Sequence, residues 1–185
     1  MAQAGEGIGN PLTGERLTFL KTNRDTDGEL LMIDWSLNPG GFLPGGAHVH
    51  PYQEERFEVI SGTLGVRVGR HKYNLGAGGA ATVPPGTLHG WWNEGDEGAH
   101  TVIEFRPALD TESLFETIYG LVRDGKTTKS GVPHPLQVIA LLEDFRNELA
   151  VPLLPLRLQR AITSALAPLA RRRGYWGRYP QYSKD

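Results

Sequence analysis

The chain has 185 residues, enough for one domain with an appendage, and a formal net charge of −2. It contains no cysteine, which excludes disulfides, thiolate metal sites and a cysteine nucleophile. Residues 1–149 carry 12 basic and 20 acidic side chains, and this acidic balance argues against a nucleic-acid partner.

The N-terminal segment shows no targeting signal. It has neither the basic start nor the apolar stretch of a signal peptide, and no run of about 18 apolar residues occurs in the chain. We therefore expect a cytoplasmic protein. Residues 1–11 are rich in glycine and polar side chains, which predicts a flexible N-terminal arm.

The sequence pattern predicts the first two strands at residues 16–22 and 29–38. In the second, Leu31, Ile33 and Trp35 share one face, but the opposite face is also partly apolar. Because both faces need cover, we expect a helix or a second subunit against this strand, and we predict a homodimer. Short strands with glycine-rich turns recur up to residue 106, a pattern typical of a barrel or sandwich.

The next segment carries the strongest chemical signal. His48 and His50 are two residues apart, so both side chains lie on one face of an extended chain. Glu55 has the parity of the apolar residues that follow it, which turns its carboxylate toward the core, where an unpaired charge is costly. A metal ion shared with the two histidines would neutralise it. Glu54 has the opposite parity and is predicted to be a solvated surface charge.

A third histidine, His89, follows the tight turn at Pro84-Pro85-Gly86. Three imidazoles and one carboxylate form a set typical of one divalent transition metal ion, Fe, Mn, Ni, Cu or Zn. The alternative is that these histidines are surface residues of polar strands, but the shared parity and the His-x-His spacing favour the metal. We expect the remaining histidines to be ordinary surface residues: His71, His100 and His134.

The candidate ligands stand in two motifs that resemble those of the cupin superfamily. The first consists of His48, His50, Glu55 and Gly62, with its leading glycine near Gly40 or Gly41. The second consists of Gly78, Pro84, Gly86, His89 and Asn93. The resemblance covers about residues 30–106. It implies a mainly β fold, an antiparallel, jelly-roll-like β-barrel over residues 12–107, with the metal at its centre.

The resemblance does not fix a reaction, because cupins include dioxygenases, decarboxylases, isomerases, lyases and non-enzymatic binders. Three histidines and one glutamate leave two open positions on a six-coordinate ion. This favours a metal-dependent oxidoreductase, dioxygenase-like, acting on a small enol, diketone or phenolic molecule, with the metal as Lewis acid and template. Tyr52, Trp91 and Trp35 are candidates for the substrate pocket, although each residue is individually more typical of core packing.

Other functions stay open. Isomerase or decarboxylase chemistry needs a base beside the metal, and the only late-strand candidate is Glu104. Its neighbours Ile103 and Phe105 occupy the apolar face, so Glu104 is expected to point outward, and we predict no catalytic residue beyond the metal ligands. A non-catalytic module that binds or senses a small molecule, or a metal that only braces the barrel, are the remaining alternatives.

Residues 108–185 predict a helical extension that packs on the barrel or on a partner subunit. Its helices are expected over residues 110–124, 135–149 and 155–169. Pro168 is expected to end or kink the third helix. We interpret the apolar stripe of that helix as a core-facing surface; it consists of Leu158, Ile162, Leu166 and Leu169.

The end of the chain is basic, since residues 150–185 carry 7 basic and 1 acidic side chain. A basic amphipathic helix with aromatic residues can lie on an anionic membrane surface. The alternative, which the sequence favours, is a helix packed on the acidic barrel of its own or a partner subunit, with its arginines paired to that surface.

Overall fold

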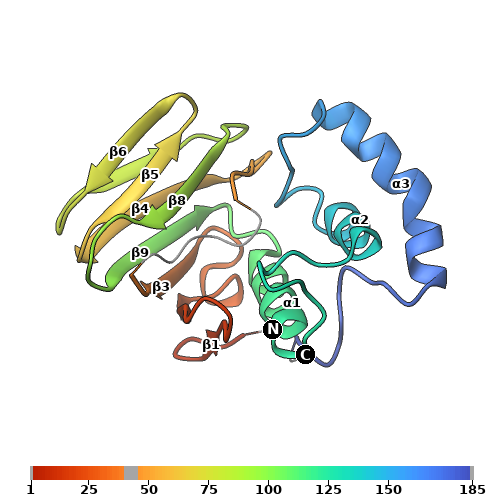
Figure 1. Cartoon of the computed structure of the whole chain (residues 1–185), viewed down its shortest axis with the longest axis horizontal. Helices are drawn as coiled ribbons and strands as arrows, with labels where there is room; N and C mark the ends of the chain where they lie inside the picture. The colour runs from red at the N-terminus through yellow and green to blue at the C-terminus, as the bar shows by residue number, and fades with distance from the viewer. Residues whose placement is uncertain (1, 40–45, 184–185) are drawn as a thin grey trace.

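The computed structural model describes residues 2–39 and 46–183, in which two antiparallel sheets stand beside three α-helices (Figure 1). The strands are β1 (Gly7–Gly9), β2 (Arg16–Lys21), β3 (Leu31–Leu37), β4 (Glu54–Ser61), β5 (Leu64–Val68), β6 (His71–Leu75), β7 (Ala80–Val83), β8 (His89–Asn93) and β9 (Ala99–Arg106). The helices are α1 (Thr111–Arg123), α2 (Pro135–Asp144) and α3 (Leu156–Arg172), and a short 3₁₀-helix spans Arg24–Thr26.

The described strands form a six-stranded sheet, in the order β1-β2-β3-β9-β4-β7, and a three-stranded sheet, in the order β6-β5-β8. Alternation explains which side chains meet between them. In β9, Ile103 and Phe105 are buried, whereas Glu104 is only partly buried and lies 3.1 Å from the Arg106 guanidinium. The mainly β, antiparallel, jelly-roll-like fold is therefore confirmed, and Glu104 points away from the core as expected.

The N-terminal segment differs from the prediction of a flexible arm. Strand β1 pairs with β2, with Ile8 opposite Leu17, and so extends the six-stranded sheet. Ala2 and Asn10, on either side of β1, are both buried. Composition alone missed this strand because a three-residue edge strand is too short to show a periodic pattern.

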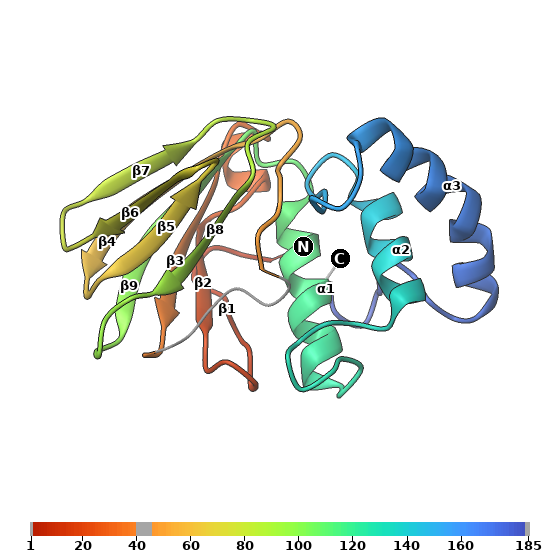
Figure 2. The same ribbon diagram turned by 45° about the horizontal axis from the view of Figure 1, so that its top comes forward.

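The helices lie on one side of the sheets, with α1 nearest, then α2, and α3 outermost (Figure 2). Phe115 and Tyr119 of α1 belong to the same buried cluster as the inward side chains of the sheets. The predicted helix over residues 135–149 ends earlier, at Asp144. The chain then turns back to the sheets, where Val49 and Ala150 exchange two backbone hydrogen bonds of 2.9 Å.

Helix α3 does not bury the predicted face. Its buried residues are small or polar, namely Gln159, Thr163, Ala167 and Ala170. The predicted core-facing stripe is instead exposed: Leu158 by 47%, Ile162 by 38%, Leu166 by 37% and Leu169 by 44%. The helix also continues through Pro168 to Arg172. Small side chains allow α3 to approach α2 closely, and Thr163 donates a hydrogen bond of 2.8 Å to Glu143 of α2.

Among the described residues, Arg171 and Arg178 form ion pairs within the helical extension rather than with the acidic side chains of the chain's own sheets, so the predicted pairing with an acidic barrel stays a prediction for a partner subunit. Arg171 contacts Asp144 at 2.6 Å and Arg178 contacts Asp110 at 2.7 Å, and both carboxylates belong to the helical extension. None of the described helices combines the length and the hydropathy needed to span a bilayer.

Candidate metal centre

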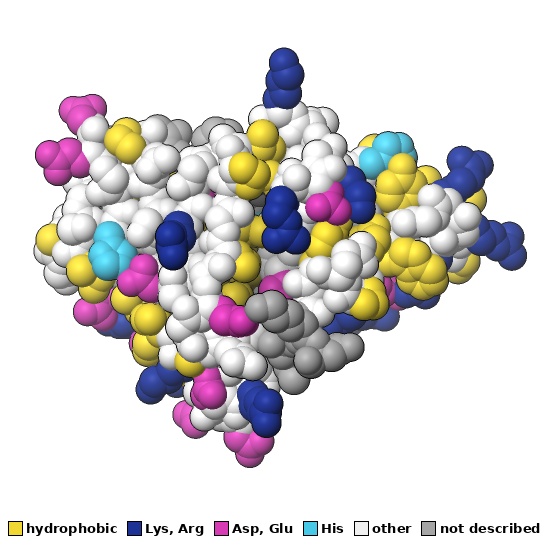
Figure 3. All heavy atoms as spheres, turned by 90° about the horizontal axis from the view of Figure 1, so that it is seen from below, with side chains coloured by type: hydrophobic (Ala, Val, Ile, Leu, Met, Phe, Trp, Pro, Cys, Tyr) yellow, Lys and Arg dark blue, Asp and Glu magenta, His cyan; other side chains and the backbone are white. Residues whose placement is uncertain are grey.

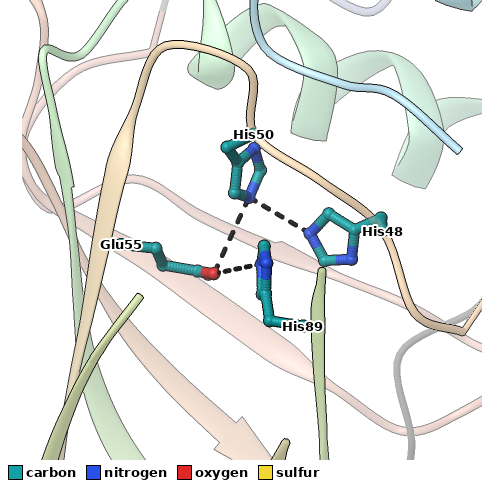
Figure 4. A group of neighbouring side chains, drawn as sticks. All are labelled: His48, His50, Glu55 and His89. Carbon is teal, nitrogen blue, oxygen red and sulfur yellow. Dashed lines mark hydrogen bonds and ion pairs between the residues drawn. The ribbon is translucent and has the colours of Figure 1, made fainter. Parts of the chain in front are cut away.

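The candidate ligands come from three segments that meet where the two sheets approach each other (Figure 4). Glu55 lies in β4 and His89 begins β8. His48 precedes β4 and is tied to His89 by two backbone hydrogen bonds, His48 N to His89 O at 2.9 Å and His89 N to His48 O at 3.0 Å. This backbone pairing holds the His48-x-His50 segment beside β8.

The four side chains point toward one another, and their ligand atoms all lie within 4.8 Å of one another. Glu55 Oε2 is 2.7 Å from His89 Nε2 and 3.7 Å from His50 Nε2. His48 Nε2 is 3.1 Å from His50 Nε2. The sequence predicted these four residues as a set, and the structure brings all four together.

The second nitrogen of each imidazole fixes the orientation of its ring. Nδ1 of His50 faces the backbone carbonyl of Glu148, Nδ1 of His89 faces that of Thr87 at 2.9 Å, and Nδ1 of His48 lies 3.4 Å from that of Gly46. A carbonyl can only accept, so each Nδ1 donates its hydrogen. The lone pair of each Nε2 is then free to bind a metal. In metal sites generally, a hydrogen bond at the second ring nitrogen fixes the tautomer and the orientation of the histidine in this way.

The lone pairs of the four ligand atoms therefore point toward one another, and few hydrogen-bond donors lie between them. Glu55 Oε2 and His89 Nε2 are buried and have no hydrogen-bond partner among the described residues, and two imidazole lone pairs face each other between His48 and His50. Buried acceptors without donors are costly. A single cation relieves all four at once, so this donor set fits a divalent metal ion bound by nitrogen and oxygen ligands.

Electrostatics keep two of the imidazoles neutral. Burial lowers the pKa of His48 well below its usual value, and His50 and His89 add to this effect. Burial also lowers the pKa of His50, against the opposing charge of Glu55. Burial also acts to lower the pKa of His89, but the adjacent Glu55 carboxylate outweighs burial, so the pKa of His89 is raised. A metal ion would compete with a proton at His89, so binding is expected to weaken at low pH.

The other candidates for ligation lie elsewhere. Glu54 is outside the group of four, as predicted from its parity. His100 pairs with Asp34 at 2.6 Å, and His134 accepts a hydrogen bond from the backbone N–H of Leu136 at the start of α2. Gly40 and Gly41, which stand near the leading position of the first motif, lie outside the described residues.

A cavity of about 120 Å³ opens next to the ligands. Its described lining consists of Trp35, Gly46, Ala47, His48, His50, Glu55, Trp91, Phe105, Thr111, Leu114, Phe115, Ile118, Leu149 and Val151. The predicted pocket residues Trp35 and Trp91 line it, with their ring centroids 4.2 Å apart in an edge-to-face contact.

Tyr52, the third predicted pocket residue, is not part of this lining. Its side chain is 51% exposed, and its hydroxyl accepts a hydrogen bond of 3.1 Å from Arg160 of α3. Tyr52 lies between His50 and β4, where the chain leaves the extended conformation, so strand parity does not determine its direction.

Sequence reasoning missed the contribution of the helical extension. One wall of the cavity is formed by Leu114, Phe115 and Ile118 of α1, and another by Leu149 and Val151 after α2. The Glu148 carbonyl, which accepts a hydrogen bond from His50 Nδ1, also belongs to the segment after α2. The apolar residues of α1 were a usable signal, but nothing in a single sequence indicates that they face a cavity rather than a filled core.

The sequence profile of the cupin domain family matches residues 33–104. This chain carries a cupin domain. The match contains all four candidate ligands, because His48 and His89 lie well within it. The structure thus joins a cupin domain to a buried His-His-Glu-His group that could hold a metal ion.

Solved structures resemble this cupin domain. A protein from Thermus thermophilus is 30% identical, over 43% of this chain and 74% of its own, with a TM-score of 0.41. An RmlC-like cupin from Shewanella frigidimarina is 24% identical, over 57% and 86%, with a TM-score of 0.48. A Thermotoga maritima protein described as a predicted oxalate decarboxylase is 16% identical, over 58% and 98%, with a TM-score of 0.50. None of the curated proteins matches the chain significantly.

Proposed function

We propose that this protein is a metal-dependent enzyme with dioxygenase-like chemistry that acts on a small, largely apolar molecule carrying oxygen donors. The observation that carries the proposal is the composition of the cavity. In its described lining, the ionisable side chains are limited to His48, His50 and Glu55, all of them candidate ligands. Chemistry in this chamber would therefore depend on the metal rather than on an additional acid or base.

The residues that line the cavity indicate the class of substrate. Trp35, Phe115 and Leu114 present aromatic and aliphatic surface, and no lysine or arginine is present in the described lining to pair with a dianion. An engineered cavity of about 150 Å³ with apolar walls holds benzene. The cavity of about 120 Å³ is therefore suited to a small diketone, enol or phenol rather than to a sugar acid.

The chain's own residues would hold, orient and shield such a substrate. When bound, the metal would supply Lewis-acid chemistry and, if it is iron, manganese, nickel or copper, redox chemistry. Phe115 and Ile118 of α1 line the cavity and would shield a bound substrate from bulk water. The Thr111 hydroxyl accepts a hydrogen bond of 2.8 Å from Gln53, which leaves its own hydrogen as a donor for a substrate oxygen.

In the described lining of the cavity no base stands beside the candidate ligands, and this is the reason to prefer an oxygenase over an isomerase or decarboxylase, whose proton transfers need a positioned side chain. Glu104, the candidate considered for that role, is not in the described lining and contacts Arg106 instead. The comparison with a protein described as a predicted oxalate decarboxylase rests on 16% identity and supports the fold alone.

The test is metal analysis of the purified protein, followed by oxygen uptake with acetylacetone, catechol and a flavonol. We expect a redox-active metal and uptake with one of the two small compounds, while the flavonol, too large for the cavity, gives none. His89→Ala serves as the metal-site control and Glu54→Ala as the matched control that retains activity. Tight binding of a small compound without uptake would instead support a non-catalytic binding protein, and bound zinc without ligand binding a structural metal.

A further inference from the structure

Helix α3 presents an apolar face that the described chain does not cover. Its exposed leucines and isoleucine recur at helical spacing, at Leu158, Ile162, Leu166 and Leu169. Leu153, 81% exposed, and Leu154, 43% exposed, extend the surface before the helix begins. We call these six residues the α3 stripe. At about 1.5 Å per residue the helix is roughly 25 Å long, so the stripe is far larger than a single exposed leucine.

Unpaired arginines accompany the α3 stripe. Arg157, Arg172 and Arg173 are exposed, and none of them has an acidic partner among the described residues. Residues 150–183 contain six arginines and no aspartate or glutamate. In Figure 3, hydrophobic and basic side chains gather together at the end of the molecule formed by α3. Any partner of this surface must therefore accept apolar side chains and supply negative charge.

The shape and charge of the surface decide between its possible partners. If two copies met through α3, each stripe would bring its arginines against those of the other, and like charges would oppose the contact. Helix α3 is the outermost helix, at the edge of the molecule (Figure 2), and the side chains of the α3 stripe are exposed there. A membrane interface with anionic headgroups offers both an apolar layer and negative charge.

We propose that α3 docks this protein onto anionic lipid membranes. The helix lies in the plane of the interface with the α3 stripe among the acyl chains, while Arg157, Arg172 and Arg173 contact lipid phosphates and carboxylates. The buried side of α3, through Thr163 and Ala167, keeps the helix attached to α2 and hence to the cupin domain. This surface lies on the far side of α2 from the sheets and does not depend on the proposed reaction (Figure 2).

The test is co-sedimentation of the full chain with vesicles. We expect binding to vesicles of phosphatidylcholine with about 30% phosphatidylserine, little binding to pure phosphatidylcholine, and release at about 1 M salt, where charges are screened within a few ångströms. Replacing the three arginines together, Arg157→Gln, Arg172→Gln and Arg173→Gln, is expected to weaken binding on the order of 100-fold. The double variant Ile162→Ser with Leu166→Ser is expected to weaken it at least about 10-fold.

Matched variants elsewhere on the surface separate this docking from a general effect of charge or hydrophobicity. Arg24→Gln, Arg70→Gln and Lys129→Gln together remove the same charge from other exposed positions, and Ile60→Ser removes an exposed apolar side chain from β4. Both should bind vesicles as the parent does, and circular dichroism checks that every variant is folded. Equal loss in the control variants would overturn the proposal. The proposal would also be overturned if the parent protein self-associated without binding vesicles while the Ile162→Ser, Leu166→Ser variant was monomeric. A monomeric parent protein that binds no vesicles would overturn it as well.

Discussion

At the scale of single residues, each imidazole of the candidate centre combines an inward lone pair with a backbone carbonyl behind it. We expect His50→Ala or His89→Ala to abolish stoichiometric metal binding, because each removes one of four ligands and leaves the Glu55 charge poorly compensated. Glu54→Ala should leave binding nearly intact, since Glu54 is not a member of the group. Elemental analysis after dialysis measures this directly. Full metal content in the His89→Ala protein would contradict the proposed ligand set.

Glu15 is another buried carboxylate, and it stands apart from the centre. Its Oε2 accepts hydrogen bonds from Thr13 at 2.8 Å, Asn10 at 3.1 Å and Tyr119 at 3.4 Å, whereas Oε1 is buried and has no hydrogen-bond partner in the described part of the chain. Burial raises the pKa of Glu15 above its ordinary value of 4.5 despite these three hydrogen bonds. The folded state therefore keeps the proton to higher pH than the unfolded chain does.

This raised pKa predicts a pH dependence of stability with a definite sign. Because the folded state binds the proton more tightly, the contribution of Glu15 to the free energy of unfolding is greatest below pH 4.5 and falls as pH rises toward the folded pKa. Glu15→Gln cannot titrate. The melting temperature of the parent, measured relative to that of Glu15→Gln, should therefore decrease from acid to neutral pH. A difference that stays constant across this range would argue against the raised pKa.

At the scale of elements, the strands around the centre could be predicted because burial on one face imposes a two-residue period. His48 and His50 follow this rule relative to each other, and Glu55 follows it relative to Phe57 and Val59. Their grouping also needed the argument that a buried carboxylate requires a cation. The rule fails where the chain is not extended, as at Tyr52, and where a strand is only three residues long, as in β1. Local sequence carries no periodic signal in either case.

The helices show a different limit. The apolar stripe of α3 was predicted to face the core, yet the buried side carries Gln159, Thr163, Ala167 and Ala170. A hydrophobic pattern shows that one face prefers to leave water, but it does not identify what covers that face. Close packing of α3 on α2 selected the small side chains instead. The role of α1 and of residues 148–151 at the cavity was equally hidden, since it depends on contacts between distant segments.

The segment after α2 offers a test of how the extension supports the centre. The Ala150 N–H donates to the Val49 carbonyl, between His48 and His50. Ala150→Pro removes this N–H and should loosen the His50 ring from the Glu148 carbonyl. Supporting contacts of this kind change metal affinity by about 10–100-fold, so we expect a loss of that order by calorimetric titration. Ala150→Gly retains the N–H and should bind nearly as the parent does; equal weakening in both variants would assign the effect to packing alone.

At the scale of the whole molecule, the sheets and the helical extension share one site. The sheets provide the ligands, while α1 and residues 148–151 provide walls and a supporting carbonyl. A metal bound there would connect β4, β8 and the segment before β4, so its binding would stabilise the arrangement of the sheets as well as the chemistry. The homodimer predicted from β3 and the helical extension stays a prediction, and sedimentation velocity of the protein alone tests it, since a single species of 20.3 kDa would contradict it.

Metal removal should therefore lower the stability of the entire fold. A ligand that binds only the folded state at about 100 times its dissociation constant adds about 2.7 kcal/mol to the free energy of unfolding. For a chain of this size that corresponds to a rise in melting temperature of about 5–10 °C. We expect the metal-loaded protein to lose this increment on treatment with a chelator and to regain it when the metal is restored. His89→Ala should melt at the same temperature with or without chelator, and a parent protein that behaves like this variant would show that the four converging side chains hold no ion in solution.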